Sequence, residues 1–314
     1  MASEANLAEL RAAYQRGAIA KAEFIARMHG EHQRLYAYRD WIRGSNVAGI
    51  EIVPDGVQVA LRTPPIRLWC PLEDRRAAPV ETLNFGDYEP EVFGVVRTLL
   101  ATLGARANTV VDVGANVGFY AIGLARMFPG ISIEAFEPIE STVRWLRANL
   151  ELNDCPNVRV HGYGLADQEG EATFHTYPSQ SVAAARERIL DDVPAETVTC
   201  RLRTLDSVRV EAGLRVDLMK CDVEGAERMV FAGARATLAE DRPVILTEML
   251  RKWSAKYGYH PNDLIADLKG FGYGCHAIGK AGLRSCPEVT EETEETNFAF
   301  LHKEAHAALS DRLP

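Results

Sequence analysis

The sequence lacks the cysteine spacing and the long apolar runs that define several classes of protein. Its six cysteines are scattered without a Cys-x-x-Cys pair, which is typical of reduced thiols and not of a disulfide framework or a zinc site. No apolar run is long enough to cross a bilayer. The first residues lack the basic segment and apolar core of a signal peptide. We therefore expect a cytoplasmic protein without a membrane span.

Basic charge is also scarce. The chain has 35 Lys and Arg against 44 Asp and Glu, for a net charge of −9, so a nucleic-acid substrate bound through a broad basic surface is disfavoured. With 314 residues, of which 47% are hydrophobic, the chain can bury a full core in one large or two small domains.

The most informative stretch lacks one glycine. Residues 109–113 form a β-branched run typical of a buried strand, and residues 120–125 have helical spacing. Gly114 and Gly118, between them, are spaced Gly-x-x-x-Gly, without the middle glycine of the dinucleotide-binding pattern. This spacing favours a nucleoside without a pyrophosphate, such as S-adenosylmethionine. Because glycine has no Cβ, we expect the backbone of this turn to approach the ligand closely.

An acidic residue follows the next predicted strand, residues 131–136. Glu137 lies about one βαβ repeat beyond Gly114, where a carboxylate can accept hydrogen bonds from both ribose hydroxyls. After a third strand at residues 158–160, the following turn is placed to meet an adenine ring, with Leu165 and Ala166 as candidates for that wall. Two further strands, near residues 171–176 and 197–202, are expected as insertions beside the substrate.

Carboxylates also follow the later strands. Asp222 ends the strand of residues 216–221 and Glu248 ends that of residues 244–247, and we expect these two strands to be neighbours. Their carboxylates could hold a divalent cation such as Mg²⁺, or act as acid and base. Glu224 and Glu227 come at the start of the next helix, where helix N-terminal charge is an equally good explanation of Glu227.

The N-terminal third is organised differently. Residues 6–41 have helical periodicity with expected breaks at Gly17 and Gly30, residues 50–61 are typical of a β-hairpin, and residues 63–84 are expected to be irregular. The helices form either an added layer on the domain or an arm that makes a homo-oligomer or caps the pocket. Glu89 then precedes a helix, either as helix-start charge or as a contact for the amino acid end of a cofactor.

Three motifs together resemble the FkbM-like methyltransferases. They are the glycine turn of residues 112–120, the Lys-x-Asp-x-Glu-Gly-x-Glu run of residues 220–227, and Tyr-Glu-Pro at residues 88–90. The resemblance covers about residues 86–301, and the second motif is its most specific part. Together with the patterns of the N-terminal third, it predicts three parts: a helical arm (1–45), a hairpin with an irregular connector (46–85) and an S-adenosylmethionine-dependent methyltransferase domain (86–314).

The resemblance implies an α/β class I methyltransferase fold, with a seven-stranded sheet, one antiparallel strand and helices on both faces. It also implies S-adenosylmethionine as methyl donor and a hydroxyl acceptor, often on a sugar of a glycan or natural product. Glu137 would hold the ribose, and Asp222 would face the reacting centre. Four residues would line the methionine part: Asp112, Gly114, Asn116 and Gly118.

A sugar hydroxyl is a poor nucleophile, so its proton must be removed or polarised. We expect Asp222 to do this, directly or by holding a divalent ion with Glu248. Rival bases are His161, His175 and His260, near predicted loops. Two other classes stay open: an oxidoreductase that uses NAD, and a non-catalytic assembly subunit that works through its N-terminal helices.

Overall fold

The computed structural model describes residues 7–177 and 179–310 and contains three β-sheets. Five adjacent strands of the largest sheet pair in parallel: β4 (Thr109–Val113), β5 (Ser132–Phe136), β6 (Val158–His161), β10 (Leu218–Cys221) and β11 (Val244–Glu248). Three more complete it: β12 (Tyr273–Gly279), β13 (Gly282–Ser285) and β14 (Asn297–His302). The order across the sheet is β13-β12-β14-β11-β10-β4-β5-β6.

This sheet has the class I methyltransferase arrangement. Its parallel strands reverse their order between β4 and β10, and β14 lies antiparallel between β11 and β12. The predicted fold is therefore confirmed. The sheet has eight strands instead of the expected seven because the chain turns back after Gly279 and β13 pairs with β12.

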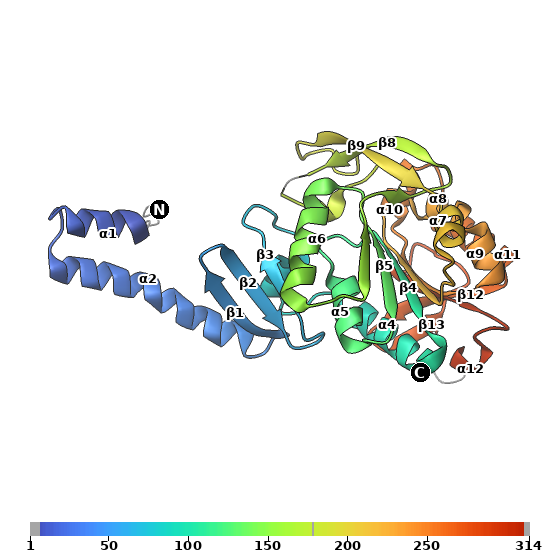
Figure 1. Cartoon of the computed structure of the whole chain (residues 1–314), viewed down its shortest axis with the longest axis horizontal. Helices are drawn as coiled ribbons and strands as arrows, with labels where there is room; N and C mark the ends of the chain where they lie inside the picture. The colour runs from blue at the N-terminus through green and yellow to red at the C-terminus, as the bar shows by residue number, and fades with distance from the viewer. Residues whose placement is uncertain (1–6, 178, 311–314) are drawn as a thin grey trace.

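Helices cover both faces of the sheet (Figure 1). Alternate side chains of one strand point to opposite faces, so Val110 and Val111 enter different cores. The first core includes residues of α4 (Pro90–Leu103), α5 (Phe119–Met127) and α6 (Glu140–Asn153). The second includes residues of α7 (Leu205–Ala212), α8 (Glu227–Ala232), α9 (Arg235–Glu240) and α11 (Pro261–Gly270). Short helical elements complete the domain: η1 (Gly104–Arg106), η2 (Ser181–Ala183), α10 (Arg251–Lys256) and α12 (Ala307–Ser310).

The expected insertion after the third parallel strand forms a separate small sheet. Its strands are β7 (Gly164–Leu165), β8 (Gly170–Thr176) and β9 (Glu196–Arg203), in the order β7-β9-β8. The long connection between β8 and β9 contributes residues to the cavity described below.

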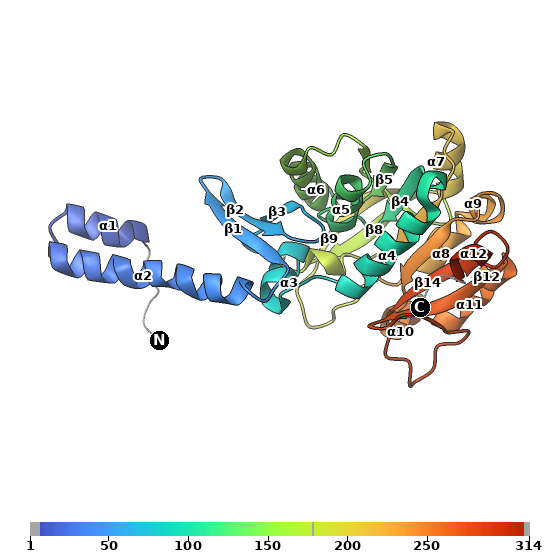
Figure 2. The same ribbon diagram turned by 90° about the horizontal axis from the view of Figure 1, so that it is seen from below.

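Two helices and a three-stranded sheet precede this domain (Figure 2). The helices are α1 (Leu7–Gln15) and α2 (Lys21–Ile42), and α2 continues through Gly30, where a break was expected. The antiparallel sheet consists of β1 (Val47–Val53), β2 (Gly56–Leu61) and β3 (Arg67–Cys70). The hairpin is thus present, but the segment expected to be irregular forms β3 and α3 (Ala78–Phe85).

The distant α6 explains why β3 could not be predicted. Its Asn149 and Asn153 side chains accept hydrogen bonds from the backbone N–H groups of Trp69 and Arg67, at 2.8 Å each. The amide of Asn153 also donates to the carbonyl of Arg67 at 2.6 Å. These two side chains give β3 a second hydrogen-bonded edge. Across the described residues, no helix combines the length and apolar character needed to cross a membrane.

Candidate active site

A cavity of about 520 Å³ lies at the carboxyl ends of β4, β5, β10 and β11. This is the edge of a parallel sheet at which ligands bind, where the strand order reverses. Most of the predicted site residues line it: Glu89, Gly114, Asn116, Glu137, Leu165, Asp222 and Glu248.

Packing within the protein requires glycine at both positions of the turn between β4 and α5. Gly114 has a φ of +77°, and a Cβ there would lie 1.9 Å from the backbone oxygen of Asp222. A Cβ at Gly118, with a φ of +95°, would lie 2.5 Å from Cδ1 of Leu146 in α6. Contacts within the protein thus require both glycines, and their close approach to a ligand stays a prediction. Gly114 allows the turn to meet the end of β10, and Gly118 allows α5 to begin against α6.

Glu137 is held in the cavity wall by the glycine turn. Its Oε2 accepts a hydrogen bond from the backbone N–H of Asn116 at 3.1 Å, and its Oε1 accepts one from that of Ile139 at 2.9 Å. Burial raises the pKa of Glu137 to about 7, although these two bonds oppose the rise. Each oxygen keeps a lone pair for a further donor, so the carboxylate can still accept from a ligand.

Leu165 and Ala166 do not share a position. Leu165 lines the cavity, whereas Ala166 is buried in a separate apolar cluster with Ile139 and Phe174. The carbonyl oxygen of Ala166 lies against Gly233, where a Cβ would come within 1.9 Å of it. Ala166 therefore does not line the cavity, because its backbone packs on Gly233 at the end of α8.

A buried lysine forms ion pairs with the acids of β4 and β10. It belongs to the motif of residues 220–227, but the sequence alone assigned it no role. Lys220 Nζ lies 3.2 Å from Oδ2 of Asp222 and 3.9 Å from Oδ1 of Asp112. It also lies 4.7 Å from the ring centroid of Tyr120. Burial opposes its charge, but the carboxylates of Asp222, Asp112 and Glu89 raise the pKa of Lys220 overall. Lys220 therefore remains a cation beneath the cavity.

Glu89 points into the cavity from the start of α4. It has a φ of 45° and makes no side-chain capping hydrogen bond, which argues against a purely helix-start role. Its Oε2 instead accepts a hydrogen bond from the hydroxyl of Tyr120 at 2.6 Å. Burial and the charge of Asp222 raise the pKa of Glu89.

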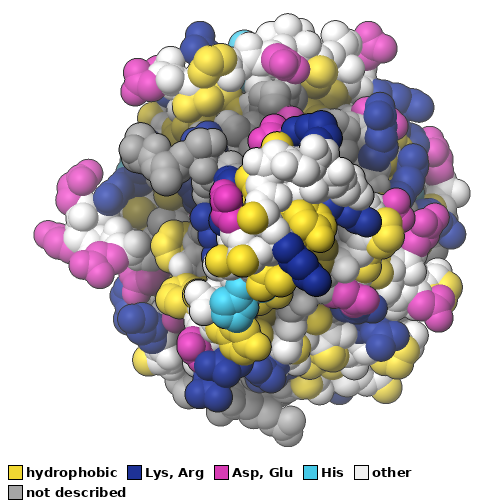
Figure 3. All heavy atoms as spheres, turned by 90° about the vertical axis from the view of Figure 1, so that its left-hand side faces the viewer, with side chains coloured by type: hydrophobic (Ala, Val, Ile, Leu, Met, Phe, Trp, Pro, Cys, Tyr) yellow, Lys and Arg dark blue, Asp and Glu magenta, His cyan; other side chains and the backbone are white. Residues whose placement is uncertain are grey.

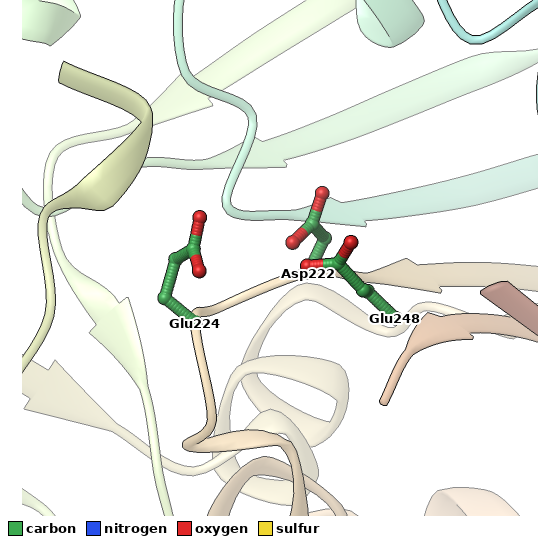
Figure 4. Close-up of side chains that lie close together, drawn as sticks. All are labelled: Asp222, Glu224 and Glu248. Atoms are coloured by element: carbon green, nitrogen blue, oxygen red, sulfur yellow. The ribbon is translucent and has the colours of Figure 1, made fainter. Parts of the chain in front are cut away.

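Three carboxylates meet at the ends of β10 and β11. Asp222, Glu224 and Glu248 each offer an oxygen within 4.8 Å of the others, and Figure 4 shows them around a common space. Burial and the charge of Asp222 raise the pKa values of Glu224 and Glu248 well above normal. Carboxylate oxygens are the ligands that Mg²⁺ and Ca²⁺ prefer. The predicted pair, Asp222 and Glu248, thus gains Glu224 as a third member.

Glu227 turns away from this group. Its Oε1 accepts hydrogen bonds from the backbone N–H groups of Val223 at 3.1 Å and Gly225 at 3.0 Å. Its Oε2 accepts one from the hydroxyl of Tyr259 at 3.1 Å. Glu227 therefore fixes the turn that carries Glu224.

The three histidines considered as bases lie elsewhere in the described chain and do not line the cavity. His161 bonds to Glu134 at 2.6 Å and stacks on Phe136. His260 caps α11 and accepts a hydrogen bond from the backbone N–H of Asn262 at 3.2 Å. His175 lies within β8 and pairs with β9. A histidine base is thus not supported by the geometry.

Several lining residues carried no sequence signal. Arg186 and Leu190 come from the connection between β8 and β9, and Trp253 comes from α10. Arg186 Nη1 donates to Sδ of Met229 at 3.2 Å. The places of Arg186 and Leu190 depend on a long irregular connection, for which periodicity gives no prediction.

The sheet order and the carboxylate-lined cavity define a class I methyltransferase fold. The chain belongs to the methyltransferase FkbM domain family, whose model matches residues 112–274, just over half of the sequence. This confirms the family resemblance drawn from the motifs.

Three relatives illustrate the family's spread. The AMB antimetabolite synthetase AmbE of Pseudomonas aeruginosa is 38% identical over 173 residues, covering 44% of this chain and 8% of that protein. The 31-O-demethyl-FK506 methyltransferase FkbM of Streptomyces tacrolimicus is 29% identical over 154 residues, covering 40% and 59%. The 2-O-methyltransferase NoeI of Sinorhizobium fredii is 27% identical over 164 residues, covering 47% and 66%. The match thus spans less than two thirds of each of these relatives.

Among solved structures, the methyltransferase FkbM from Methylobacillus flagellatus aligns with a TM-score of 0.41 and 18% identity. That alignment covers 73% of this chain and 56% of the other.

Proposed function

We propose that this protein transfers a methyl group from S-adenosylmethionine to a hydroxyl, on a sugar of a glycan or natural product. The observation that carries the proposal is the cavity itself. A nucleoside-sized space at the reversal point of the sheet has Glu137 and Leu165 on one side and the acids Asp222, Glu224 and Glu248 on the other. Two of the relatives are a 2-O-methyltransferase and a 31-O-demethyl-FK506 methyltransferase, which supports oxygen as the acceptor atom.

In this proposal different residues of the chain bind different parts of the methyl donor. S-adenosylmethionine supplies an activated methyl group on a sulfonium. Glu137 accepts hydrogen bonds from the ribose hydroxyls, and Leu165 covers the adenine. Glu89 pairs with the ammonium of the methionine part, beside the turn that contains Asp112, Gly114, Asn116 and Gly118. Holding donor and acceptor in line can by itself supply many kcal/mol of rate enhancement.

Asp222 is the proposed group that handles the acceptor's proton. It ends β10 at the cavity, and its Oδ2 is bonded to Lys220 at 3.2 Å, which fixes the carboxylate. It acts either as a base toward the hydroxyl or as a ligand of a divalent cation that it shares with Glu224 and Glu248. A cation there would polarise the hydroxyl oxygen.

An Asp222→Asn substitution tests the catalytic role. We expect turnover to fall by about 10²–10⁴-fold, the usual contribution of a positioned acid or base, while the affinity for S-adenosylhomocysteine is kept. The assay follows labelled methyl transfer to nucleotide sugars and glycan fragments, with calorimetry for the product nucleoside. Asp267→Asn is the matched control, because Asp267 of α11 is exposed and forms a salt bridge with Arg228 of α8. Near-normal turnover by Asp222→Asn would reject the role.

The cation is tested separately. Calorimetric titration with Mg²⁺ or Mn²⁺ alone should give a binding signal that Glu248→Gln and Glu224→Gln weaken. If dialysis against EDTA leaves turnover unchanged, the cation is excluded and Asp222 acts directly.

The two rival classes give different thermal shifts. A ligand that binds only the native state raises the melting temperature. We expect S-adenosylmethionine to raise it and NAD to leave it unchanged, and the reverse result would support an oxidoreductase. A non-catalytic assembly subunit would respond to neither nucleotide.

A further inference from the structure

The N-terminal helices form an arm, residues 7–43, that projects from the body of the molecule (Figures 1 and 2). Its 22-residue helix α2 is about 33 Å long at 1.5 Å per residue. Among the described residues, α2 contributes none that is buried. Helices in water draw most of their stability from tertiary packing of an apolar face. A projecting arm whose long helix buries no side chain is therefore suited to contact a partner surface.

The arm has two distinct halves. The arm tip, residues 7–28, is a hairpin in which α1 packs on the first part of α2, with Tyr14 stacked on Phe24 at a centroid distance of 4.7 Å. The hairpin still exposes Leu7 by 47% and Ile25 by 55%. The remainder of α2 is a single helix that exposes Leu35, Tyr36, Tyr38 and Trp41. Both halves thus present apolar side chains to water.

A wide apolar groove lies at the root of the arm. It encloses about 1750 Å³ between α2, the sheet of β1–β3, α6 and the small sheet that contains β9. Its apolar lining includes Leu35, Tyr38, Ile52, Trp69, Trp145 and Val198. Exposed apolar patches of this extent mark interaction sites in soluble proteins.

We propose that two copies of this chain form a two-fold dimer in which the arm tip of each copy lies in the groove of the other. The arm's own tip cannot reach the groove of its own chain, because α2 is one unbroken helix that carries the tip away from the body. A second copy supplies both surfaces at once. A two-fold axis repeats the contact, as in most homodimers.

Charge supports this occupant. The arm tip has four basic and two acidic residues, for a net charge of +2, whereas the chain as a whole has −9. The residues that line the groove include five acidic and three basic side chains, for a net charge of −2. Figure 3 looks at the molecule from the side of the arm and shows hydrophobic side chains interspersed with Lys and Arg on that face. Tip and groove thus match in both apolar character and sign of charge.

The dimer would also bring the partner's arm close to the candidate active site. The groove and the cavity share four lining residues: Pro138, Ile139, Ser181 and Ala184. An arm seated in the groove therefore lies beside one wall of the cavity.

The first test measures the mass of the full chain in solution by light scattering and sedimentation. We expect a dimer at micromolar concentration. The tip variant, Leu7→Asp with Ile25→Asp, and the groove variant, Ile52→Asp with Val198→Asp, should each be monomeric with unchanged circular dichroism. The control Val210→Asp alters a 73% exposed valine of α7, outside the groove, and should remain dimeric. A monomeric full chain would overturn the proposal.

A mixing experiment separates this arrangement from arms that pair only with each other. The tip variant has an intact groove, and the groove variant has an intact tip. A heterodimer of the two therefore retains one complete tip–groove contact. Mixing the two variants under different affinity tags should thus restore a heterodimer that neither forms alone. If the groove variant dimerises as well as the unaltered chain, or if mixing restores nothing, the tip does not occupy the groove.

Discussion

Glu137 is buried as an acid with a raised pKa, which links its protonation to the stability of the fold. Its native pKa of about 7 exceeds its ordinary value of 4.5, so its favourable contribution is complete below about pH 4.5 and is lost as pH rises through 7. At 1.36 kcal/mol per pKa unit, the loss is on the order of 3 kcal/mol. We expect Glu137→Gln to flatten the pH dependence of unfolding free energy between pH 5 and 8 by about this amount. Denaturant titrations at each pH measure it.

Glu227 is the matched control, since burial raises its pKa to about 7 as well. A Glu227→Gln variant should flatten the stability profile in the same way. Only Glu137→Gln should alter nucleoside affinity, because Glu137 lines the cavity whereas Glu227 is bonded within its own turn.

Nucleoside binding should show the opposite pH dependence. Ribose hydroxyls that donate to Glu137 favour its ionised form, so the affinity for S-adenosylhomocysteine should rise as pH increases through 7. Calorimetry in buffers of different ionisation enthalpy should detect release of a proton below pH 7. An affinity that Glu137→Gln leaves unchanged at pH 8 would show that Glu137 does not hold the ribose.

The positive charge of Lys220 compensates the negative charges of more than one buried carboxylate. Replacing it with Met leaves Asp112 and Asp222 without their cation, and breaking a buried ion pair in this way costs about 3–5 kcal/mol. The loss should be smaller at pH 5 than at pH 8, because burial raises the pKa values of Asp112 and Glu89 and protonation then relieves them. Chemical denaturation at both pH values checks this.

The exposed Lys252 offers the matched control for Lys220, since it also lies at the cavity. Lys252→Met should change the unfolding free energy by less than about 0.5 kcal/mol, as surface substitutions usually do. An equal loss in both variants would mean that burial of Lys220 among acids is not the cause.

At the scale of single residues, the sequence predicted carboxylates better than their partners. Glu137 and Asp222 directly follow β5 and β10, and Glu248 is the last residue of β11, so chain order alone places them at one sheet edge. The importance of Lys220 depends on Asp112 of the neighbouring β4, and that pairing exists only after the sheet forms. Arg186 sits in an irregular connection and carried no local signal.

At the scale of elements, the turn between β4 and α5 depends on a backbone contact. A Cβ on Gly114 would lie 1.9 Å from the Asp222 carbonyl oxygen, and the φ of +77° is itself strained for other residues. We expect Gly114→Ala to lower the unfolding free energy by about 2–5 kcal/mol, from strain and overpacking together. The shift of Asp222 should reduce methyl transfer as well. Gly130→Ala, with nothing within 4 Å of the new Cβ, should do neither.

Element boundaries also show where sequence patterns stop being sufficient. The hairpin of β1 and β2 is local, and its turn residues predict it. By contrast, β3 needs side chains of α6 that lie about 80 residues later, with Asn149 bonded to Trp69 and Asn153 to Arg67. No pattern within residues 63–84 contains that information. Gly30 failed as a helix break because one glycine costs about 1 kcal/mol in a helix, which a 22-residue helix can absorb.

At the scale of the whole molecule, the division of the chain into arm, connector and domain remains a proposal that the packing makes testable. Val59, Leu61 and Leu68 of the β1–β3 sheet share one core with Val92 and Phe93 of α4. The arm contributes Leu10 as a buried apolar residue within the tip and none from α2. We therefore expect the connector to be required for folding and the arm to be dispensable for it.

Two truncations test this difference. A chain that begins at residue 44 should fold, unfold cooperatively and bind S-adenosylhomocysteine with an affinity within a few-fold of the full chain, while losing the dimer. A chain that begins at residue 72 loses the buried side chains of the β1–β3 sheet and exposes the apolar face of α4, so it should aggregate or lack a cooperative transition. Calorimetry and light scattering on both chains decide the matter. If the chain that begins at residue 44 does not fold at any concentration, the arm belongs to the core of the fold. Its exposed helices then have a structural role within one chain.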